Sequence, residues 1–350
     1  MQGTILDTCA GDNGLWIIFN NFPALIYYDF DIRKVTFLRD YPDDEYVIRG
    51  GNFYSESICW ADNKLFILPA DMDYVVVYDS ISDTFFKKEI EVTGKSLRKC
   101  RKGFSYNGEM YCFPHLYKRI IKINLNTLDV SYTGDLENIC GNDGIYMSDR
   151  IGDTVVSGLI VSNALLTFDL KSETWNLVDI KADEKAGFVL YCCDSHDGLA
   201  YELCNSTKER IRCVNIYDGS VEGMLHTDFK IQNIFEIYDG RVLVTDRSSN
   251  QYLICDSRLN VLDKKIIDRN QKTLRLFDLS SCEKVKGKNG KMFFINQDYI
   301  YCLNDDLTFE AQKLEGCEKR RMEFMDAINS FGTETFTHSL SDFIGYISEG

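Results

Sequence analysis

Residues 65–79 read LFILPADMDYVVVYD, and this stretch carries the pattern that decides the fold. Its two apolar runs, LFIL and VVVY, are short and rich in β-branched and aromatic residues, so they predict two strands. The turn dipeptide Asp62-Asn63 stands before the first run, and the small polar residue Asp79 closes the second. The same order of turn, apolar run, loop and apolar run returns along the whole chain.

The closing residue of the second run is the clearest mark of this repeat. Each copy of the run ends on Asp or Asn, at a mean spacing of about 46 residues: Asp29, Asp79, Asn124, Asp169, Asp218, Asp256 and Asn304. A large apolar residue follows five or six positions later in every copy: Val35, Phe85, Val130, Trp175, Met224, Leu262 and Phe309. A repeat of this length is typical of stacked or radial modules.

Turn dipeptides add the remaining strands of each unit. They are Asn13-Gly14, Asp62-Asn63, Asn107-Gly108, Gly152-Asp153, Asp197-Gly198, Asp239-Gly240 and Asn289-Gly290. Asn-Gly and Asp-Gly accept positive φ at both centres of a type I′ hairpin turn. The second unit then gives the strands SESICWA, KLFILPA, YVVVYDS and TFFKKEI, and the sixth gives NIFEIY, RVLVTD, QYLICDS and VLDKKII. Four antiparallel strands repeated seven times predict an all-β, seven-bladed β-propeller over residues 1–316.

Residues 317–350 differ from the repeat and predict a short helical extension. EKRRMEFMDAINSF (residues 318–331) and HSLSDFIGYI (residues 338–347) each place apolar residues on one helical face. The extension either packs on the propeller or docks a partner.

Composition excludes some partners. The formal charge is −15 and the pI about 4.8, so neither nucleic acid nor an anionic membrane surface is expected to bind. We expect no secretory signal at the N-terminus and no membrane span. Thirteen cysteines without a C-x-x-C pair favour reduced thiols and a cytoplasmic protein.

The segment FDLKSETWNLVDI (residues 168–180) resembles the junction of the third and fourth strands in kelch repeats, which carry an aromatic residue, an acidic turn and a later tryptophan. The phrases at residues 65–79 and 111–124 are similar to those of uncharacterised bacterial kelch-like propellers. The glycine doublet of the second kelch strand is absent from these units, and Gly50-Gly51 falls between blades. The resemblance implies a propeller, but kelch-like propellers include scaffolds, oxidases and isomerases.

Longer loops are where sites are usually built, so we expect the function on the face that carries the loops between second and third strands. The tight-turn face is expected to have little room. The candidate ligand-binding residues on the long-loop face are Asn21, Phe22, Asp73, His115, Tyr117, Lys118, Arg119, Arg247, Asn250 and Asp298. The basic run RKCRK (residues 98–102) adds a candidate site for an anionic ligand, because guanidinium groups suit carboxylates and phosphates.

Enzyme signatures are sparse. Four histidines without metal-ligand spacing predict no metal site, and no cofactor fingerprint is present. If the protein is catalytic, the candidates are His115, Tyr117, Arg101, Asp71 and Asp73, and Cys100 between Lys99 and Arg101 could be a reactive thiol. The main hypothesis is a binding scaffold for a protein partner, a peptide or a polar anionic ligand. The alternatives are a metal-independent lyase, isomerase or hydrolase, and an accessory subunit of a larger complex.

Overall fold

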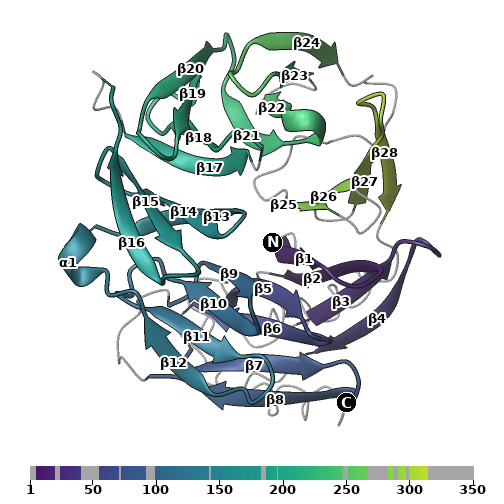
Figure 1. Ribbon diagram of the computed structural model, residues 1–350. Helices are drawn as coiled ribbons and strands as arrows, with labels where there is room; N and C mark the ends of the chain where they lie inside the picture. Colours follow the sequence, from purple (N-terminus) through teal and green to yellow (C-terminus); the bar gives the residue numbers. More distant parts are fainter. Residues whose placement is uncertain are drawn as a thin grey trace, which may run out of the picture. The chain divides into compact units, whose positions relative to one another are not determined.

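The computed structural model describes residues 5–19, 24–40, 55–70, 72–91, 99–141, 143–182, 187–194, 196–246, 251–266, 283–286, 291–296 and 299–313. These residues form seven sheets, each of four antiparallel strands in sequence order (Figure 1). The chain divides into two compact units: unit 1 comprises Met1–Ser96 and Ser281–Gly350, and unit 2 comprises Leu97–Ser280.

We call the sheets blades 1 to 7. Unit 1 holds blades 1, 2 and 7. Blade 1 comprises β1 (Ile5–Ala10), β2 (Gly14–Phe19), β3 (Ala24–Asp29) and β4 (Lys34–Asp40), and blade 2 comprises β5 (Ser55–Ala61), β6 (Lys64–Pro69), β7 (Tyr74–Asp79) and β8 (Thr84–Glu89). Blade 7 comprises β25 (Glu283–Lys286), β26 (Met292–Asn296), β27 (Tyr299–Leu303) and β28 (Phe309–Lys313).

Unit 2 holds the other four blades. Blade 3 comprises β9 (Lys102–Tyr106), β10 (Glu109–Phe113), β11 (Ile120–Asn124) and β12 (Val130–Thr133). Blade 4 comprises β13 (Ile145–Ile151), β14 (Thr154–Leu159), β15 (Ala164–Asp169) and β16 (Thr174–Asp179). Blade 5 comprises β17 (Phe188–Asp194), β18 (Leu199–Cys204), β19 (Arg210–Asn215) and β20 (Val221–His226), and blade 6 comprises β21 (Ile231–Glu236), β22 (Val242–Asp246), β23 (Gln251–Cys255) and β24 (Val261–Ile266).

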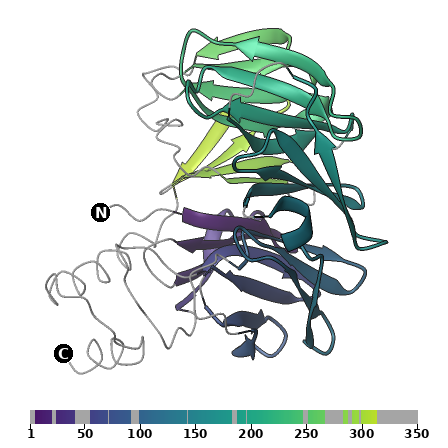
Figure 2. The same cartoon turned by 90° about the vertical axis from the view of Figure 1, so that its left-hand side faces the viewer.

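The predicted fold class, a seven-bladed β-propeller with four antiparallel strands in each blade, is confirmed. Within unit 1 the first strand β1 contacts β5 and β25, and within unit 2 β13 contacts β9 and β17 while β17 contacts β21. Within each unit, first strands of neighbouring blades therefore lie side by side, and Figure 2 shows the twist of the sheets. The sequence missed the short helix α1 (Glu137–Cys140), whereas the turn at Tyr238–Gly240 coincides with the predicted turn dipeptide Asp239-Gly240.

The second and third strands explain the apolar runs of the sequence. β6 and β18 are buried along nearly their whole length, whereas the fourth strands β8 and β16 are largely exposed or half-buried. A middle strand is covered on both faces by neighbouring blades, so both sets of alternating side chains must be apolar. Each fully buried Val, Leu or Ile contributes roughly 1.5–3 kcal/mol.

The core lies between blades rather than within them. In unit 1, Trp16 and Ile18 of blade 1 pack with Ile67 and Tyr78 of blade 2. In unit 2, Val156 of blade 4 packs with Leu190, one of the residues that blade 5 contributes to the shared cluster.

Carboxylates on the first strands, buried at Asp7 and half-buried at Asp149, add hydrogen bonds between blades to this packing. Asp7 on β1 accepts hydrogen bonds from the Ser57 hydroxyl (2.7 Å) and the Ile58 amide (2.8 Å) of β5. Asp149 on β13 accepts one from the Cys193 amide of β17 (2.8 Å). The inner edge of each of these blades is thereby fixed to its neighbour by charge-assisted hydrogen bonds.

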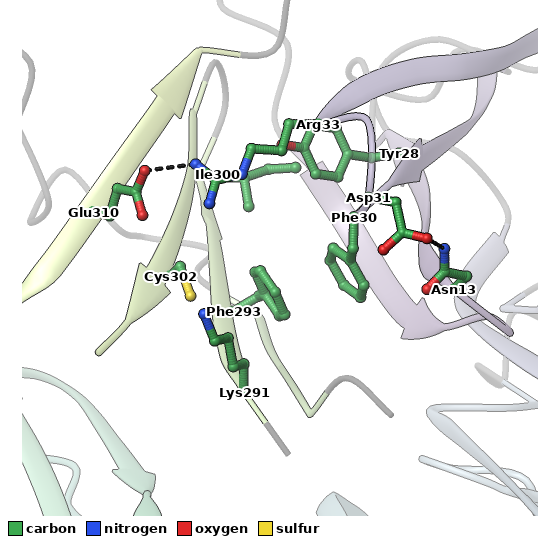
Figure 3. A pocket seen from close by; sticks show the side chains of 10 residues that line it. All are labelled: Asn13, Tyr28, Phe30, Asp31, Arg33, Lys291, Phe293, Ile300, Cys302 and Glu310. Carbon is green, nitrogen blue, oxygen red and sulfur yellow. Dashed lines mark hydrogen bonds and ion pairs between the residues drawn. The ribbon is translucent and has the colours of Figure 1, made fainter. Parts of the chain in front are cut away.

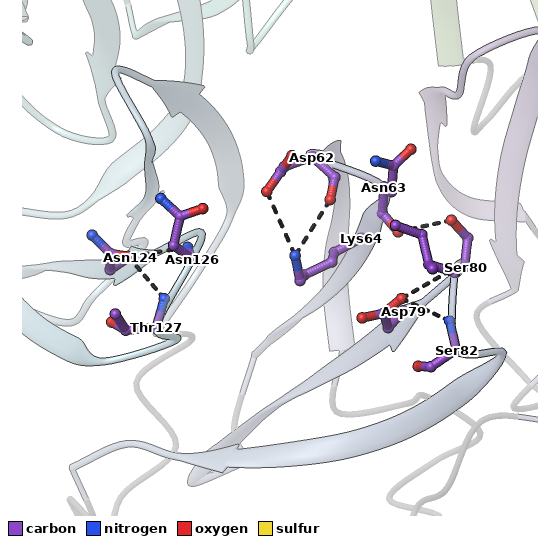
Figure 4. A network of polar contacts seen from close by, with 10 residues as sticks. Asp62, Asn63, Lys64, Asp79, Ser80, Ser82, Asn124, Asn126 and Thr127 are labelled. Atoms are coloured by element: carbon purple, nitrogen blue, oxygen red, sulfur yellow. Dashed lines mark hydrogen bonds and ion pairs between the residues drawn. The ribbon is translucent and has the colours of Figure 1, made fainter.

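The Asp or Asn that marks each repeat caps the turn between the third and fourth strands. The Asp79 carboxylate accepts hydrogen bonds from the Ile81 and Ser82 amides (2.8 and 3.1 Å), and the Asn124 side-chain carbonyl accepts them from Asn126 and Thr127 (both 3.0 Å). Figure 4 shows the capping residue at each of these two turns. The Ser82 amide above all holds the pKa of Asp79 below its ordinary value. The repeat mark is therefore an Asx turn, which needs a side-chain oxygen of this length.

Three details of the predicted repeat are wrong. In blade 5 the strand β19 ends at Asn215, which accepts from the Tyr217 amide (2.9 Å), whereas Asp218 lies in the turn and accepts from the Ser220 amide (2.9 Å). Asn13-Gly14 is not a type I′ turn, because neither residue has positive φ, and Asp197-Gly198 has it only at Gly198. The turns at Asp62-Asn63, Asn107-Gly108 and Asp239-Gly240 have positive φ at both positions. Gly14 is needed for close approach: a Cβ there would lie 2.1 Å from the Tyr28 carbonyl oxygen.

The helical extension predicted for residues 317–350, and with it the domain boundary at residue 316, lies outside the described residues. No helix among the described residues is long and apolar enough to cross a membrane.

Trp175, which follows the cap Asp169 by six residues, packs between blades 3 and 4. Its ring lies 4.8 Å from Phe168 and 5.9 Å from Phe113, centre to centre. We expect Trp175→Ala to lower the free energy of unfolding by about 3 kcal/mol, the lower end of the usual range because the ring is only partly buried. Leu177→Ala on the same strand, at a side chain that is 43% exposed, should cost less than about 1 kcal/mol. Urea unfolding measures both, and equal costs would contradict this packing.

The Asx caps predict a graded response at Asn124. Asn124→Ala removes the acceptor for two turn amides and should cost about 1 kcal/mol in urea unfolding. Asn124→Asp keeps the acceptor, as Asp does at Asp29, Asp79 and Asp169, but loses the amide that donates to Glu109 (3.1 Å), so it is made in a Glu109→Gln protein and should unfold within about 0.5 kcal/mol of that protein. A cost for Asp as large as that for Ala would show that the cap is not what stabilises the turn.

Candidate functional site

The loop between β10 and β11 carries four of the residues selected from the sequence: His115, Tyr117, Lys118 and Arg119. The backbone amide of Arg101, just before β9, donates to the Phe113 carbonyl at 2.7 Å. The structure therefore brings these five candidates together at one end of blade 3.

His115 holds the start of blade 4. Its Nδ1 is hydrogen-bonded to the Ile145 carbonyl, and because a carbonyl only accepts, Nδ1 carries the proton. The Ile145 amide donates in return to the His115 carbonyl at 2.8 Å. Gly144 makes this approach possible, since a Cβ there would lie 2.9 Å from the His115 carbonyl oxygen.

Lys118 reinforces the same junction. Its ammonium donates to the Asp143 carbonyl at 2.7 Å, and its own carbonyl accepts from the Leu136 amide at 2.9 Å. Burial would raise the pKa of the Asp143 carboxyl, but hydrogen bonds from Ser162, Gly144 and Val161 outweigh it and hold the pKa below its ordinary value. The loop is thus a clasp between blades 3 and 4.

Aromatic rings surround the remaining cation of the loop. The Arg119 guanidinium lies 4.6 Å from the centre of the Tyr132 ring and 5.7 Å from that of Tyr117, which is buried. Stacking of this kind orients a guanidinium and shields one of its faces.

In the basic run proposed as a site for an anionic ligand, Arg98 lies outside the described residues, and two of the other residues are buried. Lys99 is 1% exposed and Cys100 is fully buried, with its thiol 3.5 Å from the Lys102 carbonyl oxygen. The hypothesis of a reactive Cys100 is therefore not supported, because basic neighbours activate a thiol only where reagents can reach it. The strand that begins at Lys102 draws these residues into the blade.

The other sequence candidates are not brought together by the described residues. Asp73 belongs to unit 1, where its carbonyl accepts from the Ile90 amide at 2.8 Å. Asn21, Phe22, Asp71, Arg247, Asn250 and Asp298 lie outside the described residues. In the described part of the chain, no group of three His, Cys, Asp or Glu side chains could hold a metal ion.

A cavity of about 350 Å³ lies within unit 1, between blades 1 and 7, at the end that carries the tight turns (Figure 3). The expectation that this end has little room is therefore wrong for blades 1 and 7. We call the cavity the cup. Ten residues line it: Asn13, Tyr28, Phe30, Asp31, Arg33, Lys291, Phe293, Ile300, Cys302 and Glu310.

The floor of the cup is apolar. The rings of Phe30 and Phe293 stack in parallel, with centres 4.0 Å apart and planes at 11°. Tyr28, Phe293 and Ile300 are buried. Burial raises the pKa of Tyr28 to about 12 and also raises that of the Cys302 thiol, so both groups stay protonated at neutral pH.

The rim of the cup is charged. Arg33 donates to Glu310 at 2.7 Å, and both side chains are more than half exposed. Asn13 donates to the Asp31 carboxylate at 2.6 Å, and Lys291 is exposed. The Asx turn capped by Asp29 places this part of the rim, since its carboxylate accepts from the Asp31 and Ile32 amides.

Sequence reasoning missed the cup because its two halves lie more than 250 residues apart in the chain. One local signal was present. The position after the cap is filled by Leu125, Leu170 or Ile216 in three other blades, where it is buried, whereas blade 1 has the half-buried aromatic Phe30.

A second polar cluster lies between blades 4 and 5. Arg212 donates to Glu202 at 2.6 Å and to the Asn163 side chain at 2.7 Å, and its guanidinium lies 4.1 Å from the centre of the Phe188 ring. Both charged side chains are at most 3% exposed. Breaking such a buried pair leaves one charge uncompensated, so the cluster contributes to the stability of the fold.

Cys204 lies beside this cluster, at the end of β18. Its sulfur is 3.3 Å from the Ser206 hydroxyl and 3.7 Å from an Arg210 guanidinium nitrogen. Burial would raise the pKa of the thiol, but hydrogen bonds from Ser206, Thr207 and Arg210 outweigh it and lower the pKa to about 6.

This shift makes stability depend on pH. A thiol whose pKa is about 6 when folded and 9.0 ordinarily stabilises the fold fully above pH 9, and the gain is lost as the pH falls through 6. We therefore expect the difference in free energy of unfolding between the natural protein and Cys204→Ser to grow from pH 6 to pH 9. Cys213→Ser is the control, because burial raises the pKa of that thiol to about 12 and its difference should stay flat up to pH 8. A flat difference for Cys204→Ser would show that its sulfur is not ionised.

No protein-family model matches the chain, and no curated protein matches its sequence. Solved structures do match it. An inactive form of virginiamycin B lyase from Staphylococcus aureus, solved with quinupristin, is 10% identical with a TM-score of 0.61, and the match covers 85% of this chain and 92% of that one.

Two further solved structures are also similar to this chain. BamB from Moraxella catarrhalis is 11% identical with a TM-score of 0.52, covering 89% and 85% of the two chains. A chain of the mitotic checkpoint complex is 12% identical with a TM-score of 0.56, covering 88% and 86%. At these identities the likeness shows the fold alone: the chain shares the architecture of these β-propellers.

Proposed function

We propose that this protein is a binding scaffold that holds a peptide segment of a protein partner in the cup between blades 1 and 7. The observation that carries the proposal is the make-up of the cup, an aromatic floor inside a charged rim. Interfaces commonly concentrate their binding energy where one large side chain fills such a pocket within a polar surround.

The size of the cup favours a single side chain over a large cofactor. Its volume of about 350 Å³ lies at the low end of the roughly 300–1,000 Å³ usual for small-molecule sites. A tyrosine or tryptophan side chain buries roughly 150–250 Å², enough to anchor a peptide by one residue.

The chemistry of the cup favours binding over catalysis. Cys302 and Tyr28 keep their protons at neutral pH, so neither is an activated nucleophile or base. Arg33 and Glu310 neutralise each other, which leaves a rim suited to hydrogen bonding. The second hypothesis, a small-molecule enzyme around His115, gains no support from the clasp, since His115 is engaged with the backbone of Ile145.

The proposal also covers the family, the cellular location and the kind of partner. Kelch-like affiliation is supported by the pairing of Phe168 with Trp175 on β15 and β16. A cytoplasmic location is supported by thirteen cysteines without pair spacing. A protein partner is in keeping with a similar fold in a chain of the mitotic checkpoint complex.

The proposal is tested by identifying a partner with the immobilised full chain and then measuring its affinity as a purified protein. Phe30→Ala removes half of the stacked floor and should weaken binding at least tenfold, as loss of an interface anchor does. Tyr217→Ala removes an aromatic ring that is 72% exposed in unit 2 and should leave the affinity within twofold.

Circular dichroism and thermal unfolding of each variant show whether it is folded. If the folded Phe30→Ala protein binds every purified partner as tightly as the natural protein, the cup is not the binding site and the proposal is wrong.

A further inference from the structure

The charge around the cup is unevenly distributed, and this asymmetry restricts what the cup can hold. Figure 3 shows Asp31 and Asn13 on the side of Phe30, and Lys291 with Cys302 on the side of Phe293. The two halves of the rim therefore offer different chemistry to a bound segment.

One carboxylate, that of Asp31, lines the Phe30 side of the cup. The Asp29 carboxylate is used to cap the turn. Asp31 is exposed and accepts a hydrogen bond from the neutral Asn13 amide, with no cationic partner among the described residues.

The opposite part of the rim carries charges of both signs. Arg33 and Glu310 form their ion pair there, and Lys291 adds one exposed cation. A bound segment thus meets the Asp31 carboxylate on one side of the cup, and the Arg33–Glu310 pair with Lys291 on the other.

The floor specifies the anchor. The rings of Phe30 and Phe293 form a stacked pair, and a third ring can meet this pair edge to face or extend the stack with an offset. An aliphatic side chain would fill the space without these preferred geometries.

We propose that the segment held in the cup carries an aromatic residue with a lysine or arginine within two positions of it, the aromatic ring lying on Phe30 and Phe293 and the cation pairing with Asp31. This inference rests on the proposed function. An extended chain advances roughly 3.3–3.6 Å per residue, so a basic residue one or two positions away can reach the rim from a ring on the floor. The formal charge of −15 also speeds the approach of a basic segment.

The test uses a random dodecapeptide library displayed on phage and panned on the immobilised full chain, followed by fluorescence anisotropy with labelled synthetic copies of the enriched peptides. Enriched peptides should share an aromatic residue with Lys or Arg within two positions. Asp31→Lys should weaken them at least tenfold. Asp228→Lys, the same charge change at an exposed aspartate of unit 2, should leave affinity within twofold. Replacing the basic residue of the peptide by Glu should weaken binding to the natural protein and restore it on Asp31→Lys.

The outcomes separate this inference from the function beneath it. Peptides that lose affinity on folded Phe30→Ala, yet lack a basic residue or ignore Asp31→Lys, would overturn the inference and leave the binding scaffold intact. Enriched peptides that ignore Phe30→Ala, or a library that enriches nothing over that variant, would overturn both.

Discussion

Every blade of this protein has two apolar faces, and neither can be buried within its own sheet. A four-stranded sheet whose middle strands read LFIL and VVVY must be covered on both sides by other sheets, which is why clusters such as Trp16, Ile67 and Tyr78 span two blades. Hydrogen bonds reinforce the same contacts between blades, because Asp7 and Asp149 each accept one from the backbone of the next blade. Charged side chains within this packing are paired or hydrogen-bonded, as Arg212 is with Glu202 on two middle strands.

The strands and turns could be predicted because their causes are local. An apolar run closed by Asp or Asn states both the length of a strand and the oxygen that caps its turn, and Asn107-Gly108 has the positive φ that its residue types favour. The errors arose where one local sequence pattern was compatible with two different structures. Asp218 and Asn215 both follow apolar residues, but only Asn215 ends the hydrogen-bonded strand. Gly14 is a glycine for the sake of the Tyr28 carbonyl across the sheet, which no local pattern reveals.

The site could not be read in the same way, because residue type says what a side chain can do and not what its neighbours require of it. His115 and Lys118 have the chemistry of a catalytic pair, yet blade 4 uses both to hold its first backbone groups. Cys100 has basic neighbours in sequence but no access to solvent. The cup depends on Phe30 meeting Phe293, a contact between the first and last blades of the chain that only the tertiary fold creates.

The Asx turn explains how blade 1 can carry the proposed binding surface without loss of its fold. The cap fixes the backbone of the turn through its own oxygen, so the residues that follow it need not pack in order for the turn to form. Three blades place an apolar residue after the cap and bury it: Leu125, Leu170 and Ile216. Blade 1 keeps the cap at Asp29 and puts Phe30, Asp31 and Arg33 on the same turn, where they face blade 7. Because backbone hydrogen bonds hold this turn, those side chains would meet the proposed partner already positioned, and the entropy cost of ordering them would fall on folding instead of on binding.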